Sequence, residues 1–257
     1  MPGIKAVLMD LDGTLFLGES IIPGAPESLM RIRELGLSIT FLTNNSFYSR
    51  RMILDKLVDA GIESRLEDIV NSGFAASEYL KERRGSCRVF TVGDVGLVEE
   101  IVLGGHILVA RGDEADAVVA GGTKDISYWR LVEGHRAIMN GALFLATNKD
   151  HVYMTEKGPM PGAGAIVSFL ETSTRRKAIL VGKPERYIAD LALRKLSLSP
   201  REVVVVGDNE EVDMALAEAI GSQGILVLTG ISKNPSSNKW LVAKTPLEIP
   251  KRLSTLI

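Results

Sequence analysis

Cysteine is nearly absent from this 257-residue chain: Cys87 stands alone, so no intrachain disulfide can form. Long apolar runs are also missing, since no stretch approaches the roughly 20 residues of a membrane helix. The chain does not open with a basic region, an apolar core and a cleavage site. Charge of one sign is not in excess, because the formal net charge is only −2. We therefore expect a cytoplasmic protein that binds neither membranes nor nucleic acid.

Two common nucleotide-binding motifs are missing as well. A P-loop would need a glycine where Lys177 stands and a hydroxyl residue in place of Pro184. The run GAGAIV at 162–167 lacks the third glycine of a dinucleotide fingerprint, because Val167 occupies that position. These differences argue against a P-loop kinase and against a dinucleotide-dependent enzyme.

Short apolar runs alternate with helical patterns near both ends of the chain. The strands expected from these runs are 4–9, 37–43, 177–182, 202–208 and 224–230, and the expected helices are 23–35, 46–60, 184–195 and 212–220. The run 202–208 is continuously apolar, as in parallel strands that are buried on both faces. Alternation of this kind is typical of a parallel sheet with right-handed crossovers.

The middle of the chain has enough elements for a second sheet. Its expected strands are 88–92, 106–110, 116–121 and 142–147, and its expected helices are about 94–103, 127–139 and 162–173. We predict an α/β fold with a doubly wound, Rossmann-like parallel-sheet core formed by residues 1–76 and 176–257. An inserted α/β domain is expected over residues 77–175.

The stretch DLDGT places two aspartates, Asp10 and Asp12, where the first buried strand ends. Residues i and i+2 of a strand point to the same face, so the two carboxylates should face the same way. Close carboxylates raise each other's pKa, which brings no benefit unless a cation or a reaction uses them. A calcium loop is excluded because Ile21 stands where it would need a glutamate.

Polar residues also follow three other predicted strands. They are Thr43, Asn44 and Asn45 after 37–43, Lys183 after 177–182, and Asp208 and Asp213 after 202–208. Open α/β sheets bind their ligands at the carboxyl ends of such strands. Asp10 and Asp208 could hold a hard cation such as Mg²⁺, with Lys183 and Thr43 on the opposite side. A phosphoryl group would satisfy a metal, an ammonium and amide donors together.

In this order, DLDGT, TNN, GKP and GDNEEVD resemble the four motifs of the haloacid dehalogenase superfamily. The segments GALFLATNKD (141–150) and PMPGAGAIVSFLE (159–171) look like the NagD-like, p-nitrophenyl phosphatase branch, whose members carry a large α/β cap. The similarity covers nearly the whole chain. It implies a Mg²⁺-dependent phosphatase acting on small phosphomonoesters of the sugar phosphate, nucleotide, phosphoglycolate or p-nitrophenyl phosphate type.

The resemblance also implies a role for each motif residue. Asp10 would be the nucleophile that forms an aspartyl-phosphate, and Asp12 the general acid and base. Thr43, Lys183 and the amides around Asn44 and Asn45 would bind the phosphoryl group. The metal ligands would be Asp10, the backbone carbonyl of Asp12, and Asp208, with Asp213 in support.

Two positions depart from the family pattern. Val212 stands where threonine is common, and Gly121-Gly122-Thr123 replaces a usual Gly-Leu-Asp. The metal site should survive the first change, whereas the second puts an inherited substrate preference in doubt. The inserted domain is expected to act as a lid whose leaving-group contacts lie near Asn148, Asp150 and His151.

Several alternatives stay open at this stage. The aspartyl-phosphate could be transferred to an acceptor other than water, as in a phosphotransferase or phosphomutase. A non-enzymatic phosphometabolite-binding protein is disfavoured because Asp10 and Asp12 are both present. The resemblance is compatible with a homodimer formed through the cap. Of the three histidines, His106, His135 and His151, the last has the best chance of lying near a substrate.

Overall fold

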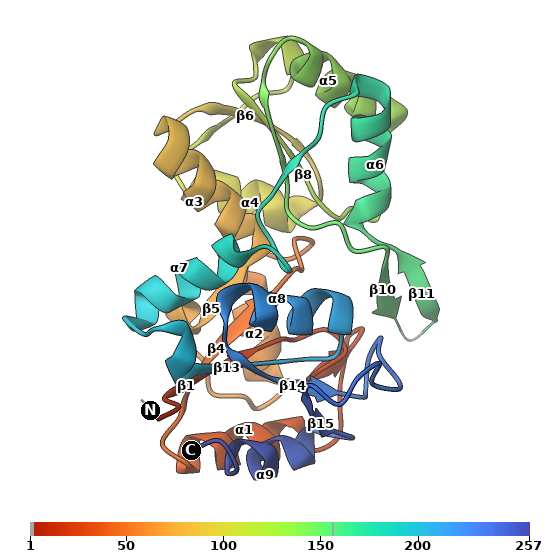
Figure 1. Cartoon of the computed structure of the whole chain (residues 1–257). Helices are drawn as coiled ribbons and strands as arrows, with labels where there is room; N and C mark the ends of the chain where they lie inside the picture. Colours follow the sequence, from red (N-terminus) through yellow and green to blue (C-terminus); the bar gives the residue numbers. More distant parts are fainter. Residues whose placement is uncertain (1–2, 156) are drawn as a thin grey trace.

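A computed structural model describes residues 3–155 and 157–257 and contains two parallel sheets stacked end to end (Figure 1). The first sheet has the order β15-β14-β13-β1-β4-β5, and every neighbouring pair is parallel. Its strands are β1 (Ala6–Met9), β4 (Ser38–Thr43), β5 (Ile69–Asn71), β13 (Val203–Gly207), β14 (Gln223–Val227) and β15 (Leu241–Ala243). The α/β class predicted from the alternating pattern is confirmed.

Helices cover both faces of the first sheet, as the alternation of side chains along β1 requires. Val7 and Met9 pack in one apolar cluster with residues of three helices, whereas Ala6 and Leu8 pack in the other cluster with residues of four different helices. The first three are α1 (Ala25–Glu34), α2 (Arg50–Asp59) and α9 (Ile249–Leu253), and the other four are α3 (Ser72–Arg84), α4 (Val95–Leu103), α7 (Arg186–Leu196) and α8 (Ala215–Ile220). This arrangement is the predicted doubly wound core.

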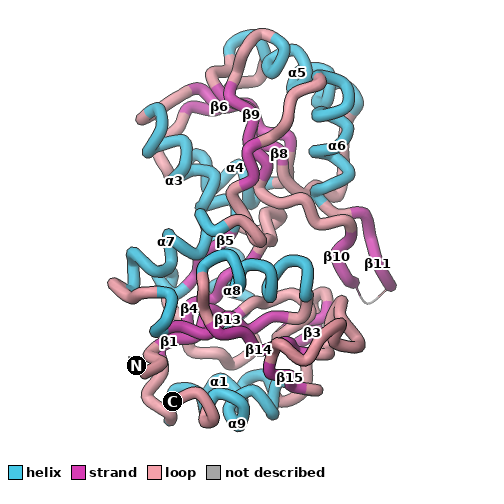
Figure 2. The backbone as a smooth tube through the Cα atoms, viewed as in Figure 1, coloured by secondary structure: helices cyan, strands magenta, loops and turns pink. Residues whose placement is uncertain are grey.

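The second sheet has the order β12-β9-β8-β6-β7 and is also parallel. Its elements are β6 (Arg88–Val92), α4 (Val95–Leu103), β7 (Ile107–Leu108), β8 (Ala117–Ala120), α5 (Tyr128–Met139), β9 (Leu143–Ala146), α6 (Ala163–Thr174) and β12 (Ile179–Leu180). Residues of α5 and α6 cover one face, whereas α4 packs on the other, in a cluster that continues into the first sheet. Figure 2 shows both sheets with their helices.

Two small hairpins and five short turns of helix complete the described chain. The hairpins are β2 (Phe16–Leu17) with β3 (Ser20–Ile21), and β10 (Val152–Thr155) with β11 (Gly158–Pro161). The turns are η1 (Leu66–Asp68), η2 (Gly112–Glu114), η3 (Pro200–Glu202), η4 (Glu210–Met214) and η5 (Pro246–Glu248). The β10–β11 hairpin projects from the second sheet toward the loops of the first (Figure 1).

One strand lies in a different sheet from the one expected. The run 177–182 was predicted as a strand of the first sheet, but β12 pairs with β9 of the second sheet. Both sheets are parallel, so a short apolar run fits either of them equally well. The predicted boundary between residues 76 and 77 falls within α3, and the boundary between 175 and 176 precedes β12. The division into two domains stays a prediction.

Two predicted helices begin at least three residues later than expected. The helix predicted for 46–60 is α2, which starts at Arg50 because the loop before it is held by side chains: Asn45 Oδ1 accepts from Phe47 N–H, and Ser49 caps the helix. The helix predicted for 212–220 is replaced at its start by η4, which is a turn of π-helix. Both changes fall in the loops that follow β4 and β13, where the predicted site residues lie.

Hydrogen bonds join α4 of the second sheet to the first residue of α2 and to the loop before it. Glu100 is 1% exposed, and its carboxylate accepts from Arg50 N–H at 2.6 Å and lies 3.1 Å from Arg50 Nε. Gly96 N–H donates to the Phe47 carbonyl at 3.0 Å. A Cβ at Gly96 would lie 2.2 Å from the Tyr48 backbone, so only glycine permits this approach. The second sheet is therefore joined to the first through α4 and the start of α2.

No helix in residues 3–155 and 157–257 is both long and apolar enough to cross a membrane.

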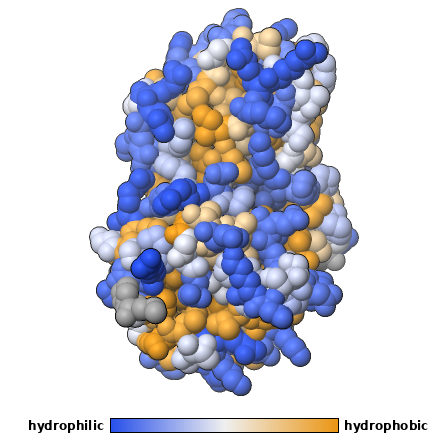
Figure 3. All heavy atoms as spheres, in the orientation of Figure 1, coloured by the Kyte–Doolittle hydropathy of each residue, from blue (hydrophilic) through white to orange (hydrophobic). Residues whose placement is uncertain are grey.

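Figure 3 shows apolar atoms gathered on the viewed face between α3 and α6, where the edge strand β12 lies. Ile179 of that strand is 38% exposed.

Candidate active site

Three neighbouring strands of the first sheet end in polar residues at one edge. Asp10 follows β1, Thr43 ends β4 and Asp208 follows β13, and β1 lies between the other two. Because all three strands are parallel, their carboxyl ends bring these side chains to the same place. The fourth polar residue, Lys183, reaches this edge from the segment that follows β12 of the second sheet.

Three buried carboxylates form a cluster that could hold a cation. Asp10, Asp208 and Asp213 are 6%, 3% and 1% exposed, and one carboxylate oxygen of each lies within 4.8 Å of the others. Burial raises the pKa of Asp10 well above its usual range, and burial with the nearby Asp213 charge raises the pKa of Asp208 to about 7. A hard divalent cation would relieve both effects, so the oxygen donors present fit such an ion.

All three carboxylates accept hydrogen bonds from neighbouring groups. Asp208 Oδ2 accepts from Ile231 N–H. Asp213 uses both oxygens, because Oδ1 accepts from Lys183 Nζ at 2.6 Å and Oδ2 accepts from Asn209 N–H at 3.1 Å. Asp10 also uses both oxygens, because Oδ1 accepts from Lys183 Nζ at 2.6 Å and Oδ2 accepts from Thr14 Oγ1 at 3.0 Å.

Two glycines make room for Asp208. A Cβ at Gly13 would lie 2.4 Å from Asp208 Oδ2, and a Cβ at Gly230 would lie 1.7 Å from it. Gly13 also has a φ of +88°, a backbone conformation that side chains disfavour. The glycine of DLDGT therefore serves both the turn after Asp12 and the approach of the third carboxylate.

Lys183 is the cation of the site. Its side chain is buried, and Nζ lies 2.6 Å from Asp10 Oδ1 and 2.6 Å from Asp213 Oδ1. Burial alone would lower the pKa of Lys183, but the charges of Asp10 and Asp213 outweigh burial and raise it above its usual range. Lys183 is therefore charged, and two of its three protons are directed at carboxylates.

Asp10 and Asp12 have different hydrogen-bond partners. Asp10 Oδ2 accepts from Thr14 Oγ1 at 3.0 Å, so the threonine of DLDGT binds the first aspartate. Asp12 is half-buried, and its Oδ2 accepts from Asn45 Nδ2 at 3.1 Å. Both aspartates line the same cavity, as their i, i+2 spacing predicts. Asp12 is thus held at the cavity edge by one oxygen.

The residues after β4 organise the other side of the site. Thr43 Oγ1 accepts from Asn45 N–H at 3.0 Å. The Asn44 side chain is engaged with Lys183, because its Oδ1 accepts from Lys183 N–H at 2.8 Å and its Nδ2 donates to the Lys183 carbonyl at 3.0 Å. The same Nδ2 lies 3.2 Å from both carboxylate oxygens of Asp150.

These groups surround a cavity of about 110 Å³ between the two sheets. Its lining includes every residue predicted for the site: Asp10, Asp12, Thr43, Asn44, Asn45, Asn148, Lys183, Asp208 and Asp213. The structure therefore brings all of them together, while their individual roles stay predictions. No sequence pattern predicts the apolar wall of this cavity, in which the rings of Phe47 and Tyr153 pack at 5.0 Å between centroids.

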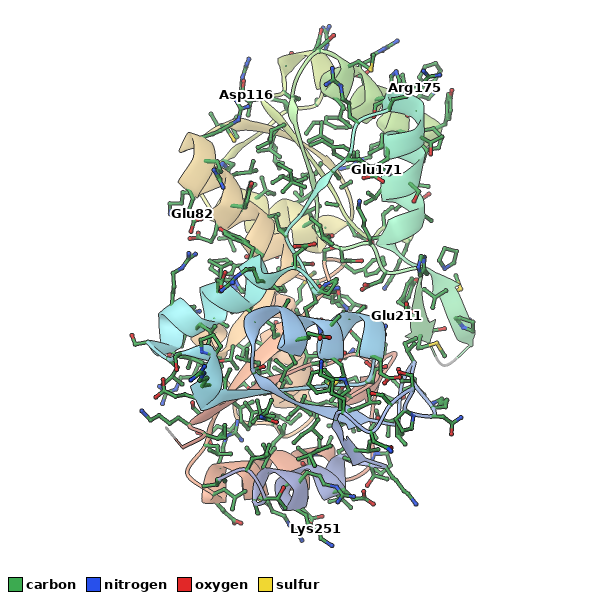
Figure 4. All side chains as sticks on the ribbon, in the orientation of Figure 1. Glu82, Asp116, Glu171, Arg175, Glu211 and Lys251 are labelled. Atoms are coloured by element: carbon green, nitrogen blue, oxygen red, sulfur yellow. The ribbon has the colours of Figure 1, made fainter. Side chains whose placement is uncertain are left out.

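The cap side of the cavity comes from the β10–β11 hairpin and the loop before it. Val152, Tyr153 and Met154 line the cavity together with Asp150, whose pKa burial raises to about 6. His151 is exposed and borders an adjoining opening of about 200 Å³. Figure 4 labels Glu211 beside this hairpin, and Glu211 lines the same opening. Val212, noted above as a departure, faces both spaces.

The remaining histidines lie away from the cavity. His106 is 5% exposed, and its ring nitrogens lie 3.0 Å from the Ser77 carbonyl and 3.4 Å from Cys87 N. His135 Nδ1 lies 3.1 Å from Ser173 Oγ on the second sheet's helices. Burial raises the pKa of the Cys87 thiol, which disfavours its reactive thiolate form. These groups fit structural roles.

The chain resembles a well-defined group of phosphatases. The family model for haloacid dehalogenase-like hydrolases matches residues 7–105, and a second model for HAD-like hydrolases matches residues 180–256. Sugar-phosphatase AraL of Bacillus subtilis is 36% identical over 228 residues, which are 88% of this chain and 84% of that protein.

Solved structures give the same result over almost the whole chain. The p-nitrophenyl phosphatase from Archaeoglobus fulgidus is 33% identical and has a TM-score of 0.90, covering 98% of this chain and 100% of that one. A glycerol phosphate phosphatase from Mycobacterium tuberculosis in complex with magnesium is 30% identical and has a TM-score of 0.88. That match covers 99% of this chain and 78% of the mycobacterial one.

Proposed function

Because the chain belongs to the haloacid dehalogenase superfamily, we propose that it is a Mg²⁺-dependent phosphatase that hydrolyses small phosphomonoesters through an aspartyl-phosphate on Asp10. The observation that carries the proposal is one cavity lined by a cluster of three buried carboxylates, a further aspartate and a buried lysine. The names of AraL and of the p-nitrophenyl phosphatase support phosphate esters as substrates. The magnesium complex of the mycobacterial relative supports Mg²⁺ as the ion.

The proposed reaction has two steps that use the same residues. Asp10 attacks phosphorus, forms an O–P bond and expels the alcohol, whose oxygen receives a proton from Asp12. Asp12, now ionised, takes a proton from water, which attacks the aspartyl-phosphate and releases inorganic phosphate and free Asp10. Because only one oxygen of Asp12 is held by Asn45, the other can exchange the proton.

The remaining polar groups stabilise charge and hold the phosphoryl group. Lys183 neutralises negative charge shared by Asp10 and the phosphoryl oxygens, and Thr43 with the Asn44–Asn45 amides binds those oxygens. A bound Mg²⁺, held by Asp10, Asp208 and the Asp12 carbonyl, supplies further positive charge that lets one anion approach another. The position of these side chains around one cavity supports the assignments.

The first test is phosphate release from a panel of phosphate esters with and without Mg²⁺. We expect turnover with Mg²⁺, none in excess EDTA, and a raised Mg²⁺ concentration for half-maximal activity in Asp208→Asn, since this change removes a carboxylate ligand. Glu218→Gln, an exposed acid on α8 that pairs with Lys239, is the matched control and should leave the Mg²⁺ requirement unchanged. Full activity in EDTA would overturn the metal assignment.

Phosphotransfer is an outcome that the same panel can detect. If the aspartyl-phosphate is passed to a sugar hydroxyl, adding a sugar will lower phosphate release and form a new ester. We expect phosphate release to continue unchanged. Consumption of substrate with no free phosphate would favour a phosphotransferase or phosphomutase over a phosphatase.

The β10–β11 hairpin is expected to contact the leaving group. Met154 lines the cavity, whereas Met160, on the paired strand, is 45% exposed and does not line it. Met154→Arg should therefore change the ranking of kcat/KM among esters, with the largest gain for leaving groups that carry a carboxylate. Met160→Arg is the matched control. Equal rankings in both variants and the parent protein would contradict a leaving-group role for the hairpin.

A further inference from the structure

The backbone of Lys183 is held by one side chain. Asn44 both accepts from Lys183 N–H and donates to the Lys183 carbonyl, so two hydrogen bonds fix a single residue. Gly182 allows this approach, because a Cβ there would lie 2.6 Å from Asn44 Oδ1 and 2.2 Å from the Thr147 carbonyl. Lys183 follows β12 of the second sheet, and these bonds direct its side chain toward Asp10 at the edge of the first sheet.

The Asn44 amide is oriented by Asp150. Both oxygens of the Asp150 carboxylate face Asn44 Nδ2 at 3.2 Å. An amide turned the other way would place its oxygen against the carboxylate and lose both bonds to Lys183. The acceptor oxygens of Asp150 therefore favour the amide orientation that clamps Lys183.

Asp150 is itself fixed within a small ring of contacts. Its N–H donates to Asn148 Oδ1 at 3.1 Å, and Asn148 Nδ2 donates to the Asn44 carbonyl at 2.8 Å. Its carbonyl accepts from Gly164 N–H at 3.0 Å at the start of α6. A Cβ at Gly162 would lie 2.1 Å from the same carbonyl oxygen. The segment 148–150 is therefore hydrogen-bonded to Asn44 at one end and to the start of α6 at the other.

We propose that Asp150 is a positioning residue for Lys183: it fixes the Asn44 amide, which holds the Lys183 backbone so that Nζ lies between Asp10 and Asp213. The inference rests on the proposed function, since it concerns the lysine that would stabilise phosphoryl transfer. In this proposal the segment that follows β9 helps to build the phosphoryl site. A segment that acted only as a lid would contact the leaving group alone. Loss of Asp150 therefore slows every substrate, whatever its leaving group.

The test compares two substrates and one inhibitor in Asp150→Ala. We expect kcat to fall by about 10²-fold on both p-nitrophenyl phosphate and a nucleoside monophosphate, as expected when a reacting group is misplaced by about 1 Å. Orthovanadate, which resembles the phosphoryl group and has no leaving group, should inhibit more weakly. Asp150→Asn keeps an oxygen that accepts from Asn44 Nδ2 and should recover most of kcat. If Asp150→Ala does not fold, Asp150→Glu replaces it, and the displaced carboxylate should also lower kcat on both substrates.

The controls separate positioning from folding and from substrate contact. Asp116→Ala removes another hydrogen-bonded carboxylate, paired with Arg88 at the far end of the second sheet (Figure 4), and should leave kcat unchanged. Asn44→Ala and the Asn44→Ala, Asp150→Ala pair should show the same loss, because both act through one contact.

Each contrary result has a distinct meaning. A loss confined to the nucleotide, or to KM, would make Asp150 a leaving-group contact and overturn the inference. Unchanged kcat in Asp150→Ala, an equal loss in Asp116→Ala, or additive losses in the pair would overturn it as well. Absence of phosphate release by the unaltered protein would instead refute the proposed function.

Discussion

Asp10→Asn is expected to abolish phosphate release while the protein stays folded. The amide keeps an oxygen for Lys183 Nζ but lacks the negative charge that attacks phosphorus. Removing one of three crowded carboxylates also relieves the burial cost that raises the pKa of Asp10. We expect kcat to fall by at least about 10⁴-fold, the scale seen when a covalent nucleophile is lost.

Steady-state kinetics and thermal unfolding of the same preparation check this result. The melting temperature of Asp10→Asn should equal or exceed that of the parent protein. Asp190→Asn is a suitable control, because Asp190 is an α7 carboxylate paired with Arg186 outside the cavity. Substantial turnover by purified Asp10→Asn would exclude covalent catalysis at this residue.

Asp12→Asn is expected to affect substrates according to the basicity of their leaving groups. An alkoxide needs a proton as it departs, whereas p-nitrophenolate is a weak base and leaves without one. Formation of the aspartyl-phosphate should therefore slow by about 10²- to 10⁴-fold for alkyl phosphates and much less for p-nitrophenyl phosphate. Its hydrolysis should slow for both, because Asp12 no longer activates water.

Transient kinetics separate the two steps. With p-nitrophenyl phosphate, Asp12→Asn should release p-nitrophenolate in a rapid burst, followed by slow turnover. Equal slowing of the first step for both esters, with no burst, would point to a structural or metal-supporting role for Asp12.

Much of the fold and the site could be predicted because each signal lies within a few residues. The aspartates of DLDGT follow a short buried strand, and parallel strands bring their carboxyl ends to one edge wherever they lie in the sequence. Thr43 and Asp208 follow the same rule, so the sequence places them beside Asp10. The departures at Val212 and at 121–123 leave this edge intact.

What could not be predicted depends on contacts between distant segments. Asp150 meets Asn44 across 106 residues, and no local pattern marks either side chain as a partner of the other. The β10–β11 hairpin carries Pro159 and Pro161 and shows no clear alternation, so its strands gave no signal. The segment before Lys183 fits either sheet, and only its pairing with β9 decides the outcome.

The central claim is that the phosphoryl group passes through Asp10. The most direct measurement is acid quenching of Asp12→Asn during turnover of p-nitrophenyl phosphate, followed by mass spectrometry of the digested protein. Hydrolysis of the intermediate is slowed in this variant, so we predict one added phosphoryl group on the peptide that contains Asp10. The double variant, which carries Asp10→Asn and Asp12→Asn, should show no added group on this peptide. Turnover with no phosphorylated peptide, or with the group on another residue, would contradict the account.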